Sequence, residues 1–156
     1  LEGSGPMLVE VRPPLSTSTY GNARRMAIGI DQNRLALLLA VLEKRAGLSL
    51  AGDDVYVNIA GGMSIEEPAA DLSVVAAVAS SVRNRGLAPA TAVFGEVGLS
   101  GEIRGIPQAG LRIREAAQMG FTRVVIPTAN VDPGESSGCE LLGVRTVGEA
   151  LDALIA

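Results

Sequence analysis

Apolar and polar residues alternate at several places along the chain, and this pattern predicts β-strands. Strands are expected at residues 7–11, 25–30, 54–60, 91–97, 121–127 and 141–144. Short return strands are expected at 63–66, as the hairpin partner of 54–60, and between Ile103 and Ile106. The second of these follows glycines that are spaced as in tight turns. The chain is therefore rich in short strands joined by turns.

Apolar residues three and four positions apart predict helices between these strands. The helices are expected at residues 31–45, 69–84, 107–119 and 146–155. Asp31 suits the N-cap of the first helix and Gly47 suits the position after its last turn. The second helix is apolar on more than one side, which indicates burial between layers. Strands and helices mix along one chain without internal repeats, so the pattern predicts a single domain of mixed α and β structure.

Length and composition favour one folded domain. The chain has 156 residues, of which 47% are apolar and 19% charged. This is enough for one hydrophobic core, and it excludes a disordered or low-complexity chain. No apolar run approaches the roughly 20 residues that a bilayer helix needs, so we expect no membrane span. The first six residues lack the features of a secretory signal, and we expect a piece of a longer cytoplasmic protein.

The residue types that are missing exclude several kinds of chemistry. Histidine is absent and Cys139 is the only cysteine, so we expect no zinc or other metal site, no disulfide and no histidine-based catalytic group. Lys44 is the only lysine and does not follow a glycine-rich loop, which excludes a Walker A motif. The net charge of −4 opposes nucleic acid binding except through a local arginine patch.

One set of motifs carries a family resemblance. The stretch Gly-Glu-Val-Gly-Leu-Ser-Gly-Glu-Ile-Arg at 95–104 is followed by Gln-Ala-Gly-Leu-Arg at 108–112 and by Glu-Ala-Ala-Gln-Met-Gly-Phe at 115–121. Supporting stretches lie in the same order at 8–11, 24–25, 29–34, 40–45 and 71–74. This ordered set resembles the C-terminal Lon-protease-like domain of the RadA (Sms) family of bacterial DNA repair proteins.

The resemblance implies the fold and the missing context of the chain. It implies the two-layer α/β (α+β) fold that Lon-protease-like domains share with ribosomal protein S5 domain 2, as one domain over residues 1–156. It also implies that a zinc finger and a RecA-like ATPase lie upstream and are absent here. The Zn, ATP and Mg that these domains would use have no site in this chain, so we expect no cofactor within it.

The resemblance also places the two catalytic positions of the Lon family, a serine nucleophile and a lysine base. The lysine position corresponds to Arg112, whose guanidinium stays protonated and cannot act as a base. The serine position falls near Asp71. Ser73 is two residues further on, which turns a helical side chain by about 200°. We therefore expect no catalytic residues and no peptidase activity in this chain.

The resemblance implies a non-proteolytic assembly and DNA-handling domain of a DNA-dependent ATPase that acts in DNA repair, homologous recombination and branch migration. We expect a hexameric ring, sequence-independent DNA binding and a recombinase partner. The predicted DNA-binding residues are Arg24, Arg25, Arg104, Arg112 and Arg114. The predicted subunit-interface residues are Glu96, Glu102 and Arg104.

Simpler readings and other functions stay open at this point. These arginines would also fit a solvated surface or salt bridges with neighbouring glutamates, and Ser73 would fit a small helix-packing residue. An active Ser/Lys peptidase of the Lon family is the main alternative function. A small-molecule-binding α/β module is another, although no cofactor fingerprint supports it.

Overall fold

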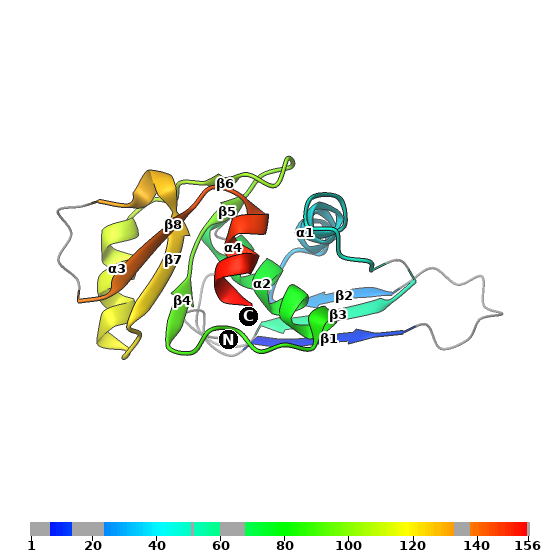
Figure 1. Cartoon of the computed structure of the whole chain (residues 1–156). Helices are drawn as coiled ribbons and strands as arrows, with labels where there is room; N and C mark the ends of the chain where they lie inside the picture. Colours follow the sequence, from blue (N-terminus) through cyan, green and yellow to red (C-terminus); the bar gives the residue numbers. More distant parts are fainter. Residues whose placement is uncertain (1–6, 14–23, 51, 60–67, 133–137, 156) are drawn as a thin grey trace.

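The computed structural model describes residues 7–13, 24–50, 52–59, 68–132 and 138–155 (Figure 1). The elements, in chain order, are β1 (Met7–Arg12), β2 (Arg25–Ile28), α1 (Gln32–Arg45), β3 (Asp54–Ile59), the 3-10 turn η1 (Pro68–Ala70), α2 (Asp71–Arg83), β4 (Thr91–Val93), β5 (Glu96–Val97), β6 (Ile103–Arg104), α3 (Ala109–Gln118), β7 (Arg123–Pro127), the 3-10 turn η2 (Thr128–Asn130), β8 (Glu140–Val144) and α4 (Val147–Leu154). The mixed α/β architecture expected from the sequence is confirmed.

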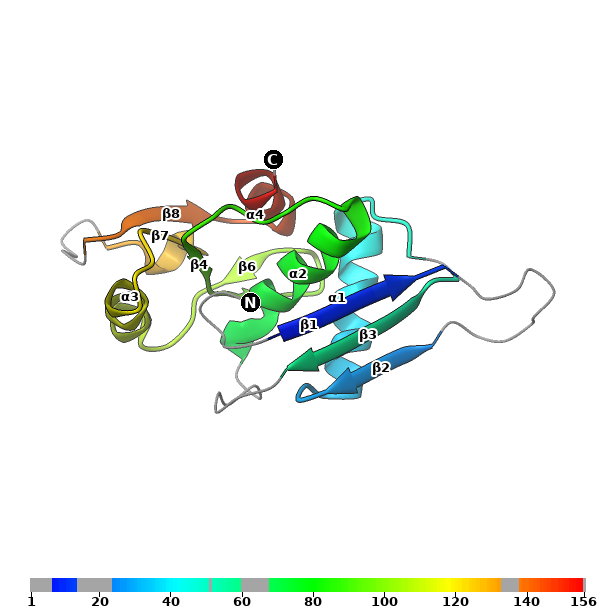
Figure 2. The same cartoon turned by 90° about the horizontal axis from the view of Figure 1, so that it is seen from below.

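The first half of the chain forms a three-stranded sheet in the order β1-β3-β2 (Figure 2). The strand β3 lies in the centre, antiparallel to β1 and parallel to β2. Its residues alternate between buried and half-buried, because Val55, Val57 and Ile59 point into the core. Helices α1 and α2 cover this inner face, and none of the described helices or strands covers the opposite, open face of the sheet.

Helix α1 forms as its sequence predicts. The Asp31 carboxylate accepts a hydrogen bond of 2.9 Å from the backbone N–H of Arg34, which caps the first turn. Gly47 follows the helix with a φ of +69°, a conformation that glycine adopts without strain. Leucines on one side of the helix are buried against the sheet and α2. Local signals and the apolar stripe therefore agree at this element.

The second half forms a parallel sheet in the order β4-β7-β8, and both of its faces are covered. One face packs against α3 through Phe94, Ile113 and Val124. The other face joins the main core, which also holds residues of α1, α2 and α4. Figure 1 shows α4 between this sheet and the first half of the molecule. The β4-β7-β8 sheet is therefore buried on both sides.

Several expected boundaries differ from the structure. The segment 91–97 is not one strand, because β4 and β5 are separated at Phe94 and Gly95 and belong to different sheets. The helix expected from residue 107 begins at Ala109, after Gln108 with a φ of +57°. The return strand expected at 63–66 lies outside the described residues. No helix in the described part of the chain has the length and apolar character that crossing a membrane requires.

Candidate functional site

A buried ion pair lies at the start of α2, where the resemblance places the protease nucleophile. The Nε of Arg34 donates a hydrogen bond of 3.0 Å to Oδ1 of Asp71, and a second guanidinium nitrogen donates to Oδ2. The backbone N–H of Val97 donates a third hydrogen bond, 3.0 Å long, to Oδ2 of Asp71. Asp71 is only 3% exposed. Its carboxylate is therefore fully engaged by neighbours within the chain.

Three elements position this pair. Asp71 opens α2, Arg34 lies in the first turn of α1, and Val97 belongs to β5. The start of α2 is tied to the segment before β5, because the N–H of Leu72 donates to the carbonyl of Gly95 at 3.0 Å. A Cβ on Gly95 would lie 3.0 Å from the Ile103 side chain, so only glycine fits there without movement. The pair therefore joins both helices to the β5-β6 hairpin.

The electrostatics of the site favour a permanently charged guanidinium on Arg34. The hydrogen bond to Asp71 raises the pKa of Arg34 above its ordinary value. The nearby charges of Asp71 and Glu96 act in the same direction, and burial acts against them. A guanidinium held in this way neither gives up a proton nor attacks a substrate. The hydrogen bonds of Arg34 hold the first turn of α1 against the start of α2.

Ser73 and Arg112, the other two residues considered for peptidase chemistry, are also engaged. Ser73 is buried, and its hydroxyl donates a hydrogen bond of 2.8 Å to the backbone carbonyl of Val93. Arg112 lies on α3 with its guanidinium 6.0 Å from the centre of the Phe94 ring, a cation-π contact. Its Nε also donates to the carbonyl of Pro107 at 3.4 Å. The structure therefore assigns packing contacts to both residues.

Arg24 and Arg25 are neighbours at the start of β2, but their roles differ. Arg24 is exposed, and its backbone N–H donates a hydrogen bond of 2.7 Å to Oδ1 of Asp54. The Arg25 side chain instead donates to the backbone carbonyls of Asp53 and, at 3.3 Å, of Leu50. Arg25 therefore holds the turn before β3, while the guanidinium of Arg24 lies on the surface.

The remaining predicted residues lie elsewhere on the molecule. Arg104 is exposed on β6 and forms a salt bridge of 2.9 Å with Glu102 of the same hairpin. Arg112 and Arg114 lie on α3, at the opposite end of the molecule from the start of β2 (Figure 1). A single copy of the chain therefore does not gather the five predicted DNA-binding arginines into one patch. Their binding of DNA stays a prediction.

Glu96 lies close enough to Arg34 for their charges to interact, which places it beside the buried ion pair. Glu102 is half-buried and is engaged with Arg104 within its own chain. Among the described residues, no three histidine, cysteine or acidic side chains come together as a metal site. The contact of Glu96, Glu102 and Arg104 with a second subunit stays a prediction.

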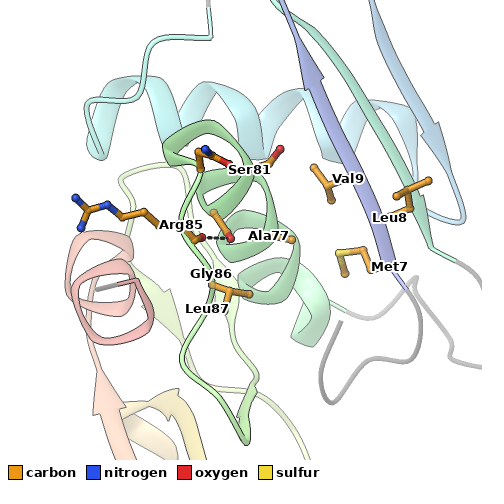
Figure 3. A pocket seen from close by; sticks show the side chains of 10 residues that line it. Met7, Leu8, Val9, Ala77, Ser81, Arg85, Gly86 and Leu87 are labelled. Atoms are coloured by element: carbon orange, nitrogen blue, oxygen red, sulfur yellow. Dashed lines mark hydrogen bonds between the residues drawn. The ribbon is translucent and has the colours of Figure 1, made fainter.

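A groove of about 460 Å³ lies between β1 and the C-terminal end of α2 (Figure 3). It is lined by Met7, Val9 and Leu87 among others, and the Arg85 guanidinium points away from β1. The hydroxyl of Ser80 donates to the backbone carbonyl of Arg85. Apolar side chains line much of the groove, and Ser80, Ser81 and Arg85 line it as well. Nothing in it favours a small-molecule site.

Sequence reasoning missed two features that the structure brings out. Arg34 was part of a resembling stretch, but its partner lies 37 positions away and no local pattern connects them. The open face of the first sheet carries Leu8, Met26 and Ile28, each about half exposed. The sequence did contain a signal for this apolar outer face, because β1 and β2 carry apolar residues at consecutive positions, which point to opposite faces of the sheet.

Comparison with known proteins agrees with this geometry. The family model for the Lon protease (S16) C-terminal proteolytic domain matches residues 46–136. The DNA repair protein RadA of Bacillus subtilis (strain 168) is 49% identical over 152 residues, which are 97% of this chain and 33% of that protein. The RadA protein of Escherichia coli (strain K12) is 47% identical over 150 residues, which are 96% of this chain and 33% of that protein.

The chain thus spans about a third of the length of the curated relatives it matches. The family match covers more than half of the chain, and the RadA proteins match nearly all of it. The resemblance stated from the motifs is confirmed. The chain belongs to the family of Lon protease C-terminal proteolytic domains, is closely similar to RadA DNA repair proteins, and carries a buried Asp71–Arg34 ion pair where the protease serine is expected.

Proposed function

We propose that this chain is a non-proteolytic domain that supports assembly and DNA handling in a RadA-type DNA repair protein. The observation that carries the proposal is the Asp71–Arg34 pair at the expected nucleophile position. A serine peptidase needs a hydroxyl next to a group that can take its proton. In this chain the expected nucleophile position holds the Asp71 carboxylate, which accepts hydrogen bonds from three N–H groups, and no hydroxyl. The relatives are DNA repair proteins, which supports the other half of the proposal.

The test of the non-proteolytic part is direct. The chain is incubated with casein and, separately, with a serine-reactive fluorophosphonate probe, with an active Lon protease as the positive control. We expect neither cleavage nor labelling. Arg112→Lys is also expected to be inactive, because a lysine alone does not supply the missing nucleophile. Cleavage by the unaltered chain that disappears in Ser73→Ala would overturn this part and support the Ser/Lys peptidase alternative.

The proposed context is a longer protein with an upstream zinc finger and a RecA-like ATPase that uses ATP and Mg. In that protein the domain would help to form a hexameric ring and hold DNA during homologous recombination and branch migration, together with a recombinase. A ring supports this proposal physically, because six copies of one exposed arginine around a channel offset the charge of −4 of each chain locally. The whole activity belongs to the longer protein.

Arg24 is the sharpest test of DNA contact, because its side chain is exposed whereas that of Arg25 is bonded to backbone carbonyls. Each phosphate contact releases counterions, so log affinity falls with log salt by about 0.9 per contact on duplex DNA. In the longer protein, Arg24→Ala is expected to weaken binding to unrelated duplexes equally and to make the salt slope shallower. Arg24→Lys should retain most of the binding.

Arg83→Ala is the matched control, since it removes the same charge from an exposed position at the end of α2. It should leave both affinity and salt slope unchanged. Fluorescence anisotropy with labelled duplexes over a range of salt concentrations provides the measurement. Equal affinity and slope for Arg24→Ala and the unaltered protein would contradict DNA contact at this position.

A further inference from the structure

The outer face of the first sheet carries an apolar patch. Leu8, Met26 and Ile28 are 51%, 51% and 49% exposed on this face. Tyr56 lies between Glu10 and Met26 in the register of the three strands. Leu8, Met26 and Tyr56 line a groove of about 390 Å³. Outward positions of a half-covered sheet are normally polar, so large apolar side chains on neighbouring strands mark an interaction surface.

The charges around this patch indicate a protein partner. The groove is bordered by Glu10 and Asp54 as well as by Arg12 and Arg24, so its charges balance. Surfaces that bind nucleic acids carry a marked excess of positive charge. An apolar centre with methionine and tyrosine inside a rim of mixed charges is the usual composition of a protein–protein interface. Arg24, a predicted DNA contact, forms part of this rim.

The β5-β6 hairpin presents a complementary feature. Leu99 at its tip is 69% exposed, more than any other large apolar side chain in the described part of the chain. The tip is held by backbone bonds from Gly101 to Gly98 at 3.0 Å and from Val147 to Gly101 at 2.8 Å. A preordered tip loses little conformational freedom when a partner covers it. Leu99 therefore has the properties of an anchor side chain.

The hairpin and the patch lie on opposite sides of the molecule. In Figure 1 the first sheet is seen nearly edge-on, with α1 and the hairpin above it, and in Figure 2 the strands lie in front of α1. One chain cannot bring its own Leu99 to its own sheet face. A contact between them needs two copies, and such a head-to-tail contact generates a ring or a filament.

We infer that the open face of the β1-β3-β2 sheet is the docking site for the hairpin tip of a second copy of this chain, with Leu99 inserted over Tyr56. The charges support this occupant, because Glu102 and Arg104 flank the tip and can face the arginines and carboxylates of the rim. The inference rests on the self-association in the proposed function and names the two surfaces that carry it.

The test uses one variant of each surface in the 156-residue chain. Leu99→Asp alters the tip and leaves the sheet face intact, and Met26→Asp does the reverse. Both positions are exposed, so the fold should survive, which circular dichroism checks. In sedimentation experiments up to about 1 mM the unaltered chain should associate, and each variant alone should raise the dissociation constant at least about tenfold.

An equimolar mixture of the two variants provides the decisive measurement. The intact tip of Met26→Asp can dock on the intact face of Leu99→Asp, and no further contact remains. We therefore expect a complex of two chains that does not grow. Leu111→Asp, which alters an exposed leucine on α3, should associate like the unaltered chain.

Three results would overturn the inference. If Leu99→Asp alone still pairs while Met26→Asp does not, the sheet faces bind each other and the hairpin has no part in the contact. If both variants assemble like the unaltered chain, the proposed self-association stands and these two surfaces do not mediate it. If the unaltered chain stays monomeric throughout, both the docking contact and self-association of the chain are wrong.

Discussion

Replacement of Asp71 by alanine tests the central role that the structure gives to the buried ion pair. The carboxylate accepts two hydrogen bonds from Arg34 and one from the N–H of Val97. Alanine removes the acceptor that these three donors share. The N–H of Val97 is then left unpaired in a buried place, whereas Arg34 keeps a hydrogen bond of 3.5 Å to the Val97 carbonyl and reaches solvent. The substitution therefore removes the connection between α1, α2 and the β5-β6 hairpin while it leaves the helix propensity high.

The size of the effect follows from the burial of the two partners. A buried N–H without an acceptor costs about 1–3 kcal/mol. Breaking a fully buried ion pair costs about 3–5 kcal/mol, but the side chain of Arg34 is 34% exposed and water can solvate part of it. We therefore assign about 1–2 kcal/mol to the arginine and expect a total loss of about 2–5 kcal/mol for Asp71→Ala.

Asp71→Asn should lose about half as much, because the amide oxygen keeps one acceptor in place. For a chain of this size, a loss of about 2–5 kcal/mol lowers the melting temperature by about 4–20 °C. Urea unfolding followed by circular dichroism measures the free energy of unfolding and shows whether the slope with denaturant stays constant. A double-mutant cycle with Arg34→Ala should give a coupling of about 1–2 kcal/mol.

Asp152→Ala is the matched control, since it removes an exposed carboxylate from α4 and should change the free energy of unfolding by no more than about 0.5 kcal/mol. The reasoning is refuted if Asp71→Ala unfolds within about 0.5 kcal/mol of the unaltered chain. It is also refuted if Asp71→Ala and Arg34→Ala are fully additive, because the two side chains would then not depend on each other.

Two further predictions concern a glycine and a carboxyl group. Gly29→Ala should destabilise the fold more than Gly47→Ala. Both glycines have a positive φ, but only at Gly29 would a Cβ meet a backbone atom, the Ile59 oxygen, at 2.2 Å. Equal urea midpoints for the two variants would contradict this prediction. A hydrogen bond from its own backbone N–H, then one from Arg104, lowers the pKa of Glu102 below 4.5. Stability from this group is therefore present above that pH and is lost as the pH falls through the folded-state pKa. An NMR titration should give a midpoint below 4.5 that rises in Arg104→Ala.

Local signals predicted the elements whose stability is local. The cap at Asp31 was read correctly from the sequence, because the residues that determine it are neighbours in the chain. The Thr146 hydroxyl likewise accepts a hydrogen bond of 3.1 Å from the N–H of Glu149, so the start of α4 could be read in the same way.

The break between β4 and β5 could not be read in this way. The segment 91–97 has a strand-like pattern throughout, but Gly95 bonds to Ala69 and Leu72 at the start of α2 instead of to a neighbouring strand. The Asp71–Arg34 contact is hidden for the same reason, since it depends on how two helices pack and not on any spacing along the chain. The family resemblance located the expected nucleophile position, and only the packing of the helices showed that the Asp71–Arg34 pair occupies it.

The position of β3 in the middle of the first sheet has a consequence for synthesis of the chain. Within the described residues, β1 and β2 each pair with β3 alone, so neither has a hydrogen-bonded neighbour there until residues 54–59 have been made. The 41 residues between the end of β1 and the start of β3 take about 2–8 s to translate at about 5–20 residues per second. During this interval the apolar side chains of β1 have no partner strand to pack with. The N-terminal part of the domain therefore folds only after β3 has left the ribosome.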